Sequence, residues 1–339
     1  MRRPLLIGLI AGGLAFVILI VVGIVVGVGI VDRNAALAEH DEVSTELAGY
    51  VDDSAAAIAE ADQVLAVASD PLLPVDPVAA VTTERDAAAA ALAEAEPLLA
   101  ADVDELDPEG IRALSASLRT ASTEVRADDE HIRTAVQNLI LATFDGAAAV
   151  ESANFSAENE PHLAFRAALG DQVSVDALVA YLDAAHALEA SHAEEIAEKS
   201  GPLLDRRLQV ESFARSIVGG VLLDFDWAVT VNGYGTGGSY GGTSYWWSDE
   251  GGYATITLSD SVASMWPGAG VQSLVAHEVG HAILSKCTEL FFGTEYEAGG
   301  EEPWATAWAI GMGYTADGSG ESIYGRPPDA LIQISTQCR

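Results

Sequence analysis

The composition of this 339-residue chain changes near residue 215, and this change limits the chain to a composite fold. From residue 34 to residue 214, alanine, leucine, valine and acidic residues recur every three or four positions, with few aromatic residues or glycines. This spacing predicts an all-α helical bundle or a coiled-coil stalk. From residue 215 to residue 339, glycine, aromatic and β-branched residues predominate, which predicts a small α+β domain.

A charge-free run from Leu5 to Val31 precedes the helical region. It exceeds the ~20 apolar residues that cross a bilayer, so residues 1–33 are expected to hold a cytoplasmic start and an N-terminal transmembrane helix. A cleaved signal peptide is the alternative, because Ala36-Leu37-Ala38 has the small residues of a cleavage site. However, the run is longer than the ~7–15 apolar residues of a signal peptide, which favours a retained anchor.

The flanking charges of this run predict its orientation. Arg2 and Arg3 favour a cytoplasmic N-terminus, although Arg33 on the far side weakens that bias. The expected location is therefore the cell membrane, with a single pass and the C-terminal domain outside the cytoplasm. Glycines four residues apart at Gly8 and Gly12 allow close helix contact in lipid, which suggests a homodimer through the anchor.

The formal charge of −35 excludes some classes of partner. Nucleic acids and anionic lipid surfaces attract basic proteins, so neither is expected as a partner. The only two cysteines are Cys287 and Cys338. Outside the cytoplasm such a pair predicts one disulfide, while two free thiols or a thiolate metal ligand are the alternatives.

Three segments follow one another at the start of the C-terminal domain. "DFDWAVTVNGY" (224–234) and "YATITLSDSV" (253–262) alternate as strands do, and "GTGGSYGGTSYWWSDEGG" (235–252) between them reads as a glycine-rich loop. Its aromatic residues either line a binding surface or pack in hairpin turns. The sequence does not decide between the two.

The segment "VAHEVGHAIL" (275–284) contains the pattern His-Glu-x-x-His. No proline interrupts residues 273–286, so a helix is expected there. On a helix His277 and His281 lie one turn apart on the same face and can bind one metal ion, while Glu278 is placed to hold a metal-bound water. Because His281 is the last histidine, a third ligand must be a downstream carboxylate. The candidates are Glu289, Glu295, Glu297, Glu301, Glu302, Asp317, Glu321 and Asp329.

The segment "EPWATAWA" (302–309) is the best source of that ligand, because two glycines precede a helix-like stretch. With the histidine pattern, it resembles the zincin metallopeptidases of the gluzincin kind, whose second helix bears Glu-x-x-Ala-(Asp/Glu)-x-x-Ala. Glu302, Ala305 and Ala309 match this motif, whereas Thr306 replaces its usual acidic residue. The resemblance covers the last third of the chain only.

The resemblance implies a zinc ion held by His277, His281 and Glu302, with Glu301 as the reserve ligand. It implies that Glu278 acts as the catalytic base and passes the proton of the attacking water to the leaving amine. Tyr314, Tyr324 and Arg326 are candidates for the oxyanion donor.

The resemblance also implies an edge strand before the active-site helix along which a peptide or protein substrate pairs. "YATITL" (253–258) stands where that strand is expected, and an interior strand is the alternative. Two functions other than a membrane-anchored peptidase stay open: an anchored binding module without catalysis, and a zinc hydrolase of non-peptide amides.

Overall fold

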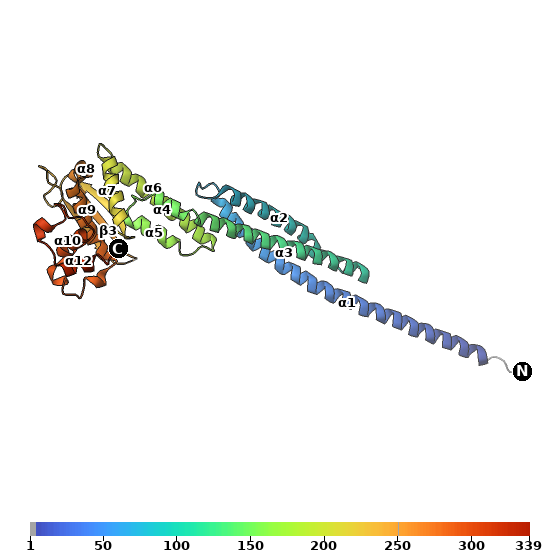
Figure 1. The fold of residues 1–339 in the computed structure, drawn as a ribbon. Helices are drawn as coiled ribbons and strands as arrows, with labels where there is room; N and C mark the ends of the chain where they lie inside the picture. Colours follow the sequence, from blue (N-terminus) through green and yellow to red (C-terminus); the bar gives the residue numbers. More distant parts are fainter. Residues whose placement is uncertain (1–4, 250) are drawn as a thin grey trace. The chain divides into compact units, whose positions relative to one another are not determined.

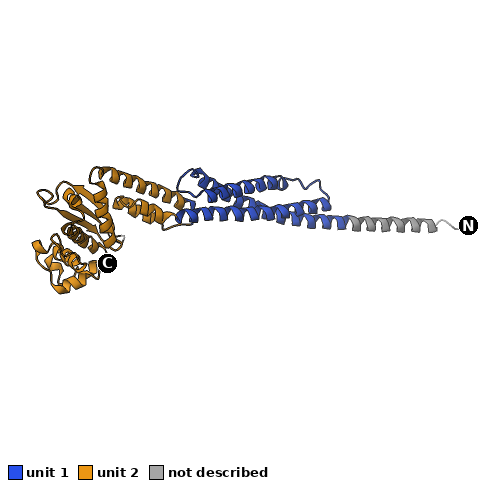
Figure 2. Ribbon diagram, turned by 45° about the horizontal axis from the view of Figure 1, so that its top comes forward, with its two compact units in different colours: residues 1–145, 173–175 blue, residues 146–172, 176–339 orange. Residues whose placement is uncertain are grey.

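The computed structural model describes residues 5–249 and 251–339, with side chains described from Val26 onward. The chain is mostly helical and forms two compact units, one of residues 1–145 and 173–175, the other of residues 146–172 and 176–339 (Figure 2). The second unit therefore begins at Gly146, not near residue 215 as the composition suggested. The reason is that helices from the alanine-rich region share a core with the sheet: Val210 and Ala214 are buried with Phe225 and Ile256.

The first unit is a bundle of three long helices, α1 (Leu5–Ala66), α2 (Val75–Leu99) and α3 (Pro108–Phe144), which run alongside one another (Figure 1). Buried positions on α1 and α3 recur at steps of three, four or seven residues, as in a coiled-coil seam. On α1 they are Ala36, Val43, Leu47, Ser54, Ala57, Ala61 and Val64, and on α3 they include Ile111, Ser115, Leu118, Ser122 and Val125. Half of these side chains are alanine or serine, which allows close packing of the helices.

The prediction of a transmembrane helix is corrected by the structure. Among the residues whose side chains are described, no helix carries an apolar stretch long enough to cross a bilayer. In the described part of α1 the apolar stretch ends at Val31, and Arg33 donates hydrogen bonds to the carbonyls of Val103 (3.2 Å) and Asp104 (3.0 Å) in the α2–α3 loop. The single-pass anchor and the cell-membrane location that depended on it are therefore not supported. Residues 1–25, which include Arg2, Arg3 and the paired glycines, lie outside the described side chains.

The second unit contains a three-stranded sheet with helices packed around it. Its first helices are α4 (Ala147–Ala153), α5 (Asn159–Ala168), α6 (Val175–Glu198) and α7 (Leu204–Ile217). The strands are β1 (Leu222–Ala228), β2 (Gly242–Trp247) and β3 (Tyr253–Ser259). They are followed by α8 (Asp260–Met265), α9 (Ala269–Ala282), α10 (Glu301–Gly311), α11 (Glu321–Tyr324) and α12 (Asp329–Ser335), with short 3-10 turns at Ile283–Ser285, Thr288–Leu290 and Glu297–Gly299.

The order of the strands is β1-β3-β2, with β3 parallel to β1 and antiparallel to β2. The expectation that "YATITL" forms the edge strand is therefore wrong, because β3 is the central strand. The edge strands are β1 and β2, and β2 lies in the stretch interpreted as a glycine-rich loop. Strand β2 pairs with β3 along its whole length, from Gly242 opposite Leu258 to Trp247 opposite Tyr253.

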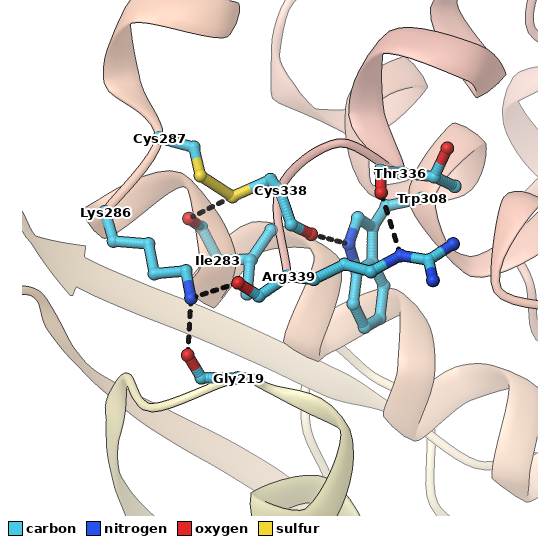
Figure 3. The surroundings of a disulfide bond; sticks show 8 residues. All are labelled: Gly219, Ile283, Lys286, Cys287, Trp308, Thr336, Cys338 and Arg339. Atoms are coloured by element: carbon cyan, nitrogen blue, oxygen red, sulfur yellow. Dashed lines mark hydrogen bonds between the residues drawn. A yellow bond between two sulfur atoms is a disulfide. The ribbon is translucent and has the colours of Figure 1, made fainter.

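The predicted disulfide is confirmed: Cys287 and Cys338 are bonded, and they close a loop across 51 positions (Figure 3). The segment around Cys338 is also held by hydrogen bonds, since Trp308 Nε1 donates to its carbonyl (3.0 Å) and Lys286 Nζ donates to the carbonyl of Arg339 (2.6 Å). The disulfide thus fixes the end of α12 against the turn that follows α9. It also rules out Cys287 as a metal ligand.

Candidate metal centre

Helix α9 carries the His-Glu-x-x-His pattern in the core of the second unit. His277, Glu278 and His281 are all buried, with 4%, 3% and 9% of their surface exposed. Helix α10 packs closely across α9 at Gly280, where an added Cβ would meet the backbone of Ala305 at 2.8 Å. A glycine is therefore required at position 280, and the close approach brings the start of α10 to the two histidines.

The structure brings His277, His281 and Glu302 together, and we call these three residues the metal cluster. One ligand atom from each lies within 4.8 Å of the others. The Oε2 atom of Glu302 is 3.0 Å from Nε2 of His277 and 3.4 Å from Nε2 of His281. The two imidazole rings are nearly perpendicular, at 82°, with centroids 5.0 Å apart.

The second nitrogen of His277 is held by backbone. Nδ1 lies 3.1 Å from the carbonyl oxygen of Ser319, and because a carbonyl only accepts, this nitrogen carries the proton. Gly320, at φ +92°, packs against the ring, and an added Cβ there would come within 2.9 Å of it. The carbonyl therefore selects the tautomer that leaves Nε2 free to bind a metal ion. Thr306 Oγ1 lies at 3.5 Å from the same Nδ1, so it contributes little to this arrangement.

The second nitrogen of His281 faces a carboxylate. Its Nδ1 is 3.8 Å from Oε2 of Glu301, and the same carboxylate oxygen accepts a hydrogen bond from Trp246 Nε1 on β2 (3.1 Å). Glu301 is thus outside the metal cluster, on the far side of a cluster histidine. The neighbouring acids on α10 take different places, with Glu302 in the cluster and Glu301 behind it.

Glu278 has an oxygen with nothing to bind among the described residues. Its Oε2 is buried without a hydrogen-bond partner. The carboxyl packs against β2 so closely that a Cβ on Gly242 would meet it at 2.6 Å. Burial raises the pKa of Glu278, and the nearby histidines act in the opposite direction. A buried unsatisfied carboxylate oxygen is costly, so this position favours a hydrogen-bonding or ionic partner from outside the chain.

The metal cluster is also electrostatically coupled. Burial by itself lowers the pKa of His281, but the carboxylates of Glu301 and Glu302 outweigh burial and raise the pKa to about 9. Burial by itself raises the pKa of Glu302, but its contacts with His277 and His281 outweigh burial and hold the pKa well below its usual range. The imidazolium of His281 and the carboxylate of Glu302 thus attract one another.

Only one of the three candidate oxyanion donors reaches the metal cluster. Tyr324 stacks on His277, with ring centroids 5.9 Å apart and planes at 7°. Tyr314 packs instead edge-on against Phe213, and Arg326 is exposed and lies 3.8 Å from Glu321 and 3.5 Å from Asp329. The other acids considered as the third metal ligand lie outside the group that could hold a metal ion among the described residues. They are Glu289, Glu295, Glu297, Glu301, Asp317, Glu321 and Asp329.

Three contributions to the centre were not expected from the sequence. The Ser319 carbonyl is a backbone group, and no residue type is needed to supply it. Trp246 and Gly242 belong to β2, which the density of glycines around it concealed. The one available signal was "SYWW" (244–247), whose aromatic residues favour a strand.

The donor set suits a divalent transition metal. Two imidazole nitrogens and one carboxylate oxygen are a common catalytic zinc ligand set, and four tetrahedral ligands at about 2.0–2.1 Å lie roughly 3.3 Å from one another. The distances of 3.0 Å and 3.4 Å from Glu302 Oε2 to the two Nε2 atoms are close to that separation.

Comparison with family models, with curated proteins and with solved structures finds no match for this chain.

Proposed function

We propose that the second unit is a zinc-dependent peptidase that hydrolyses peptide bonds with an activated water. The observation that carries this proposal is a metal cluster whose two histidines share helix α9 with the buried, unsatisfied Glu278. Three protein ligands leave one coordination position open, which distinguishes catalytic from structural zinc sites. A zinc ion held by His277, His281 and Glu302 would supply a Lewis acid and a water with a pKa of about 7.

Glu278 acts as the general base and acid in this proposal. It takes a proton from the attacking water as the oxygen bonds to the peptide carbonyl carbon, and it passes that proton to the amine nitrogen when the C–N bond breaks. Tyr324 is placed to donate a hydrogen bond to the carbonyl oxygen as negative charge develops there. Glu301 orients His281, and Ser319 orients His277.

The edge strand β2 provides a place for an extended substrate. It pairs with β3 on one side, and on its other side no strand pairs with it in the described part of the chain. An extended peptide can add to such an edge through backbone hydrogen bonds. Because Gly242 lies directly against the carboxyl of Glu278, a peptide on this edge passes next to the proposed base.

A binding module without catalysis is the rival function. Such a module has no use for a buried carboxylate without a partner, because that group destabilises the fold. A zinc hydrolase of non-peptide amides shares the chemistry of the metal cluster, but the free edge of β2 favours a peptide backbone as the substrate.

The test measures zinc content and peptide cleavage on the same preparations of the full chain. The parent is expected to hold one zinc ion in the second unit and to cleave members of a peptide mixture, as read by mass spectrometry. His277→Ala should lose the zinc, while Glu278→Gln should keep it and lose about 10²–10⁴-fold in turnover. His131→Ala is the matched control, because that side chain is 63% exposed in the other unit. A parent that binds no zinc when zinc is supplied, or Glu278→Gln as active as the parent, rules out the proposal.

A further inference from the structure

A pocket of about 410 Å³ opens beside His277 and Glu278. It lies between the glycine-rich turn before β2 and the segment that joins α10 to α11. Its volume is within the range of ligand pockets, roughly 300–1,000 Å³. The buried Glu278, whose Oε2 has no partner among the described residues, lines this pocket. A substrate residue next to the bond that is cut would therefore place its side chain here.

The walls of the pocket combine apolar, aromatic and acidic groups. Leu274 and Ile323 are apolar, Tyr234, Tyr240 and Tyr324 present rings, and Asp317 is the one charged residue besides His277 and Glu278. Neither lysine nor arginine lines it. Such walls suit a long aliphatic stem with a cationic end, because the stem packs on apolar surface and the cation is attracted to aromatic faces and to a carboxylate.

Asp317 is held firmly in its position. Its backbone carbonyl accepts a hydrogen bond from Tyr240 (2.9 Å), and its Oδ1 accepts one from Ser322 (3.0 Å). The next residue, Gly318, has φ +109°, and an added Cβ would come within 2.3 Å of the carbonyl oxygen of Gly270 at the start of α9. The loop that carries Asp317 is thus packed against the helix that carries the proposed base.

The charge of Asp317 is not balanced by the chain. Asp317 and Asp329 are both exposed acids, but Asp329 lies 3.5 Å from Arg326, whereas Asp317 has no cationic partner among the described residues. Burial and then the charge of Asp317 raise the pKa of Tyr240, so that charge acts inside the pocket. If a zinc ion is bound, the charges of Glu302 and Glu278 offset its two positive charges. Asp317 is then the remaining negative charge in the pocket.

We infer that this pocket binds a lysine or arginine side chain of the substrate, with Asp317 as the specificity-determining residue. The inference rests on the proposed peptidase function. Acidic side chains are excluded by repulsion at Asp317, and neutral side chains gain the apolar walls without the charge contact.

The test compares peptides that differ at one position. Cleavage sites of the zinc-loaded full chain are first mapped in a peptide mixture, and a cleaved sequence is then made with lysine, norleucine or glutamate at the residue flanking the cut. Norleucine keeps the aliphatic stem of lysine and lacks the ammonium group. The parent should favour lysine over norleucine by roughly tenfold or more in kcat/KM, as for loss of a hydrogen bond to a charged group.

Variants of Asp317 assign the preference to this residue. Asp317→Asn should bring the lysine-to-norleucine ratio close to one, and Asp317→Lys should favour the glutamate peptide. Asp329→Asn, which removes an exposed acid that does not line the pocket, should keep the parent ratio. A parent ratio near one, or a ratio that Asp317→Asn does not change, overturns the inference while cleavage itself still supports the peptidase.

Failure of the peptidase proposal is read separately. If no peptide is cleaved, the proposed function fails, and two labelled peptides of one neutral sequence, with lysine or norleucine at the central position, are titrated against the zinc-loaded chain by fluorescence polarisation. Tighter binding of the lysine peptide that is lost in Asp317→Asn supports the cation pocket. Equal binding of both peptides, or no binding of either, overturns it.

Discussion

The second unit buries charge in two places, and the two places differ in how that charge is compensated. One is the charge network of Glu195, Lys199, Glu211 and Arg215, in which Lys199 lies 2.6 Å from Glu195 and 3.3 Å from Glu211, and Arg215 lies 3.2 Å from Glu211. The other is the metal cluster with Glu278. The charge network contains two cations and two acids, so its charges balance within the chain.

The metal cluster has no such balance. Its one acid, Glu302, contacts two histidines and Tyr324, and Glu278 Oε2 has no partner among the described residues. Burial is similar at both places, since Glu211 is fully buried and Glu278 is 3% exposed. Buried charge therefore does not by itself mark a functional site. The mark is a buried charge that the chain leaves uncompensated, because this is where a ligand must supply the partner.

The largest expected effect comes from replacing one glutamate by glutamine in the charge network and one in the metal cluster. The first replacement should mainly lower stability, and the second should mainly remove zinc binding. Glu211→Gln leaves Lys199 and Arg215 short of a negative charge in the core, so it should lower the free energy of unfolding by roughly 3–5 kcal/mol. Glu302→Gln should abolish stoichiometric zinc binding and lower the stability of the metal-free chain by less than Glu211→Gln does, because that side chain is 43% exposed.

Both effects can be measured on one signal. All six tryptophans lie between residues 227 and 308, so tryptophan fluorescence during urea unfolding reports on the second unit alone. Zinc content is measured on the same samples. If Glu211→Gln proves as stable as the parent, or Glu302→Gln as unstable as Glu211→Gln, the contrast between a structural and a ligand-binding cluster does not hold.

A middle-sized effect is expected at Glu301, which contacts a metal-cluster histidine but does not itself belong to the metal cluster. It contacts His281 from behind and is held by Trp246, so Glu301→Gln should weaken zinc binding by roughly 10–100-fold without removing it. Trp246→Phe removes only the indole donor and should have a smaller effect in the same direction. The measurement is competition for zinc with a chelating indicator.

The matched control for Trp246→Phe is Trp247→Phe. Trp247 is the next residue of β2, is 44% exposed and stacks on Tyr253, away from Glu301. Its substitution should leave zinc affinity unchanged. Equal affinities of Glu301→Gln and the parent would mean that Glu301 does not orient His281.

These residues also show how far sequence reasoning reaches. The spacing of His277 and His281 could be predicted from helical periodicity, and the pairing of Cys287 with Cys338 from the scarcity of cysteine. Glu302 could be chosen only through the resemblance of its segment to the second helix of the gluzincins. Glu301 and Glu302 are neighbours in the sequence, so the sequence does not show which of them is the metal ligand. The packing of α10 on α9 at Gly280 places Glu302 in the metal cluster and Glu301 behind His281.

The mistaken predictions have physical reasons too. Glycines surround β2 and none of its residues is fully buried, so its sequence resembles that of a loop. The resemblance to zincins, and not a pattern in the residues, placed β3 at the edge of the sheet. The helices of residues 146–217 carry the same alanine-rich pattern as the bundle, and their partner in packing is not encoded in that pattern. Apolarity alone indicated an anchor, which the described helices do not support.

The last expected effect compares two buried histidines with opposite pKa shifts. Acids raise the pKa of His281, whereas burial lowers the pKa of His162 to about 4 from 6.5. His162 faces Glu151 at 3.8 Å, and the charges of Arg166 and Arg215 also lower its pKa. Between about pH 4 and pH 6.5, His162 is therefore protonated in the unfolded chain and neutral in the folded chain.

The stability that His162 contributes should therefore be complete above about pH 6.5 and decline as the pH falls toward 4. The free energy of unfolding of the parent relative to His162→Gln should decrease by roughly 2 kcal/mol over that range. Urea unfolding followed by tryptophan fluorescence measures it, and His131→Gln, at an exposed histidine in the other unit, should show no such trend. Because Asp224, whose pKa is raised to about 6 by burial, is present in both chains, its own opposite pH dependence cancels in the difference. If the difference in the free energy of unfolding between the parent and His162→Gln stays constant with pH, His162 can take up a proton in the folded chain. The pKa shifts of His162 and His281 would then not be opposite.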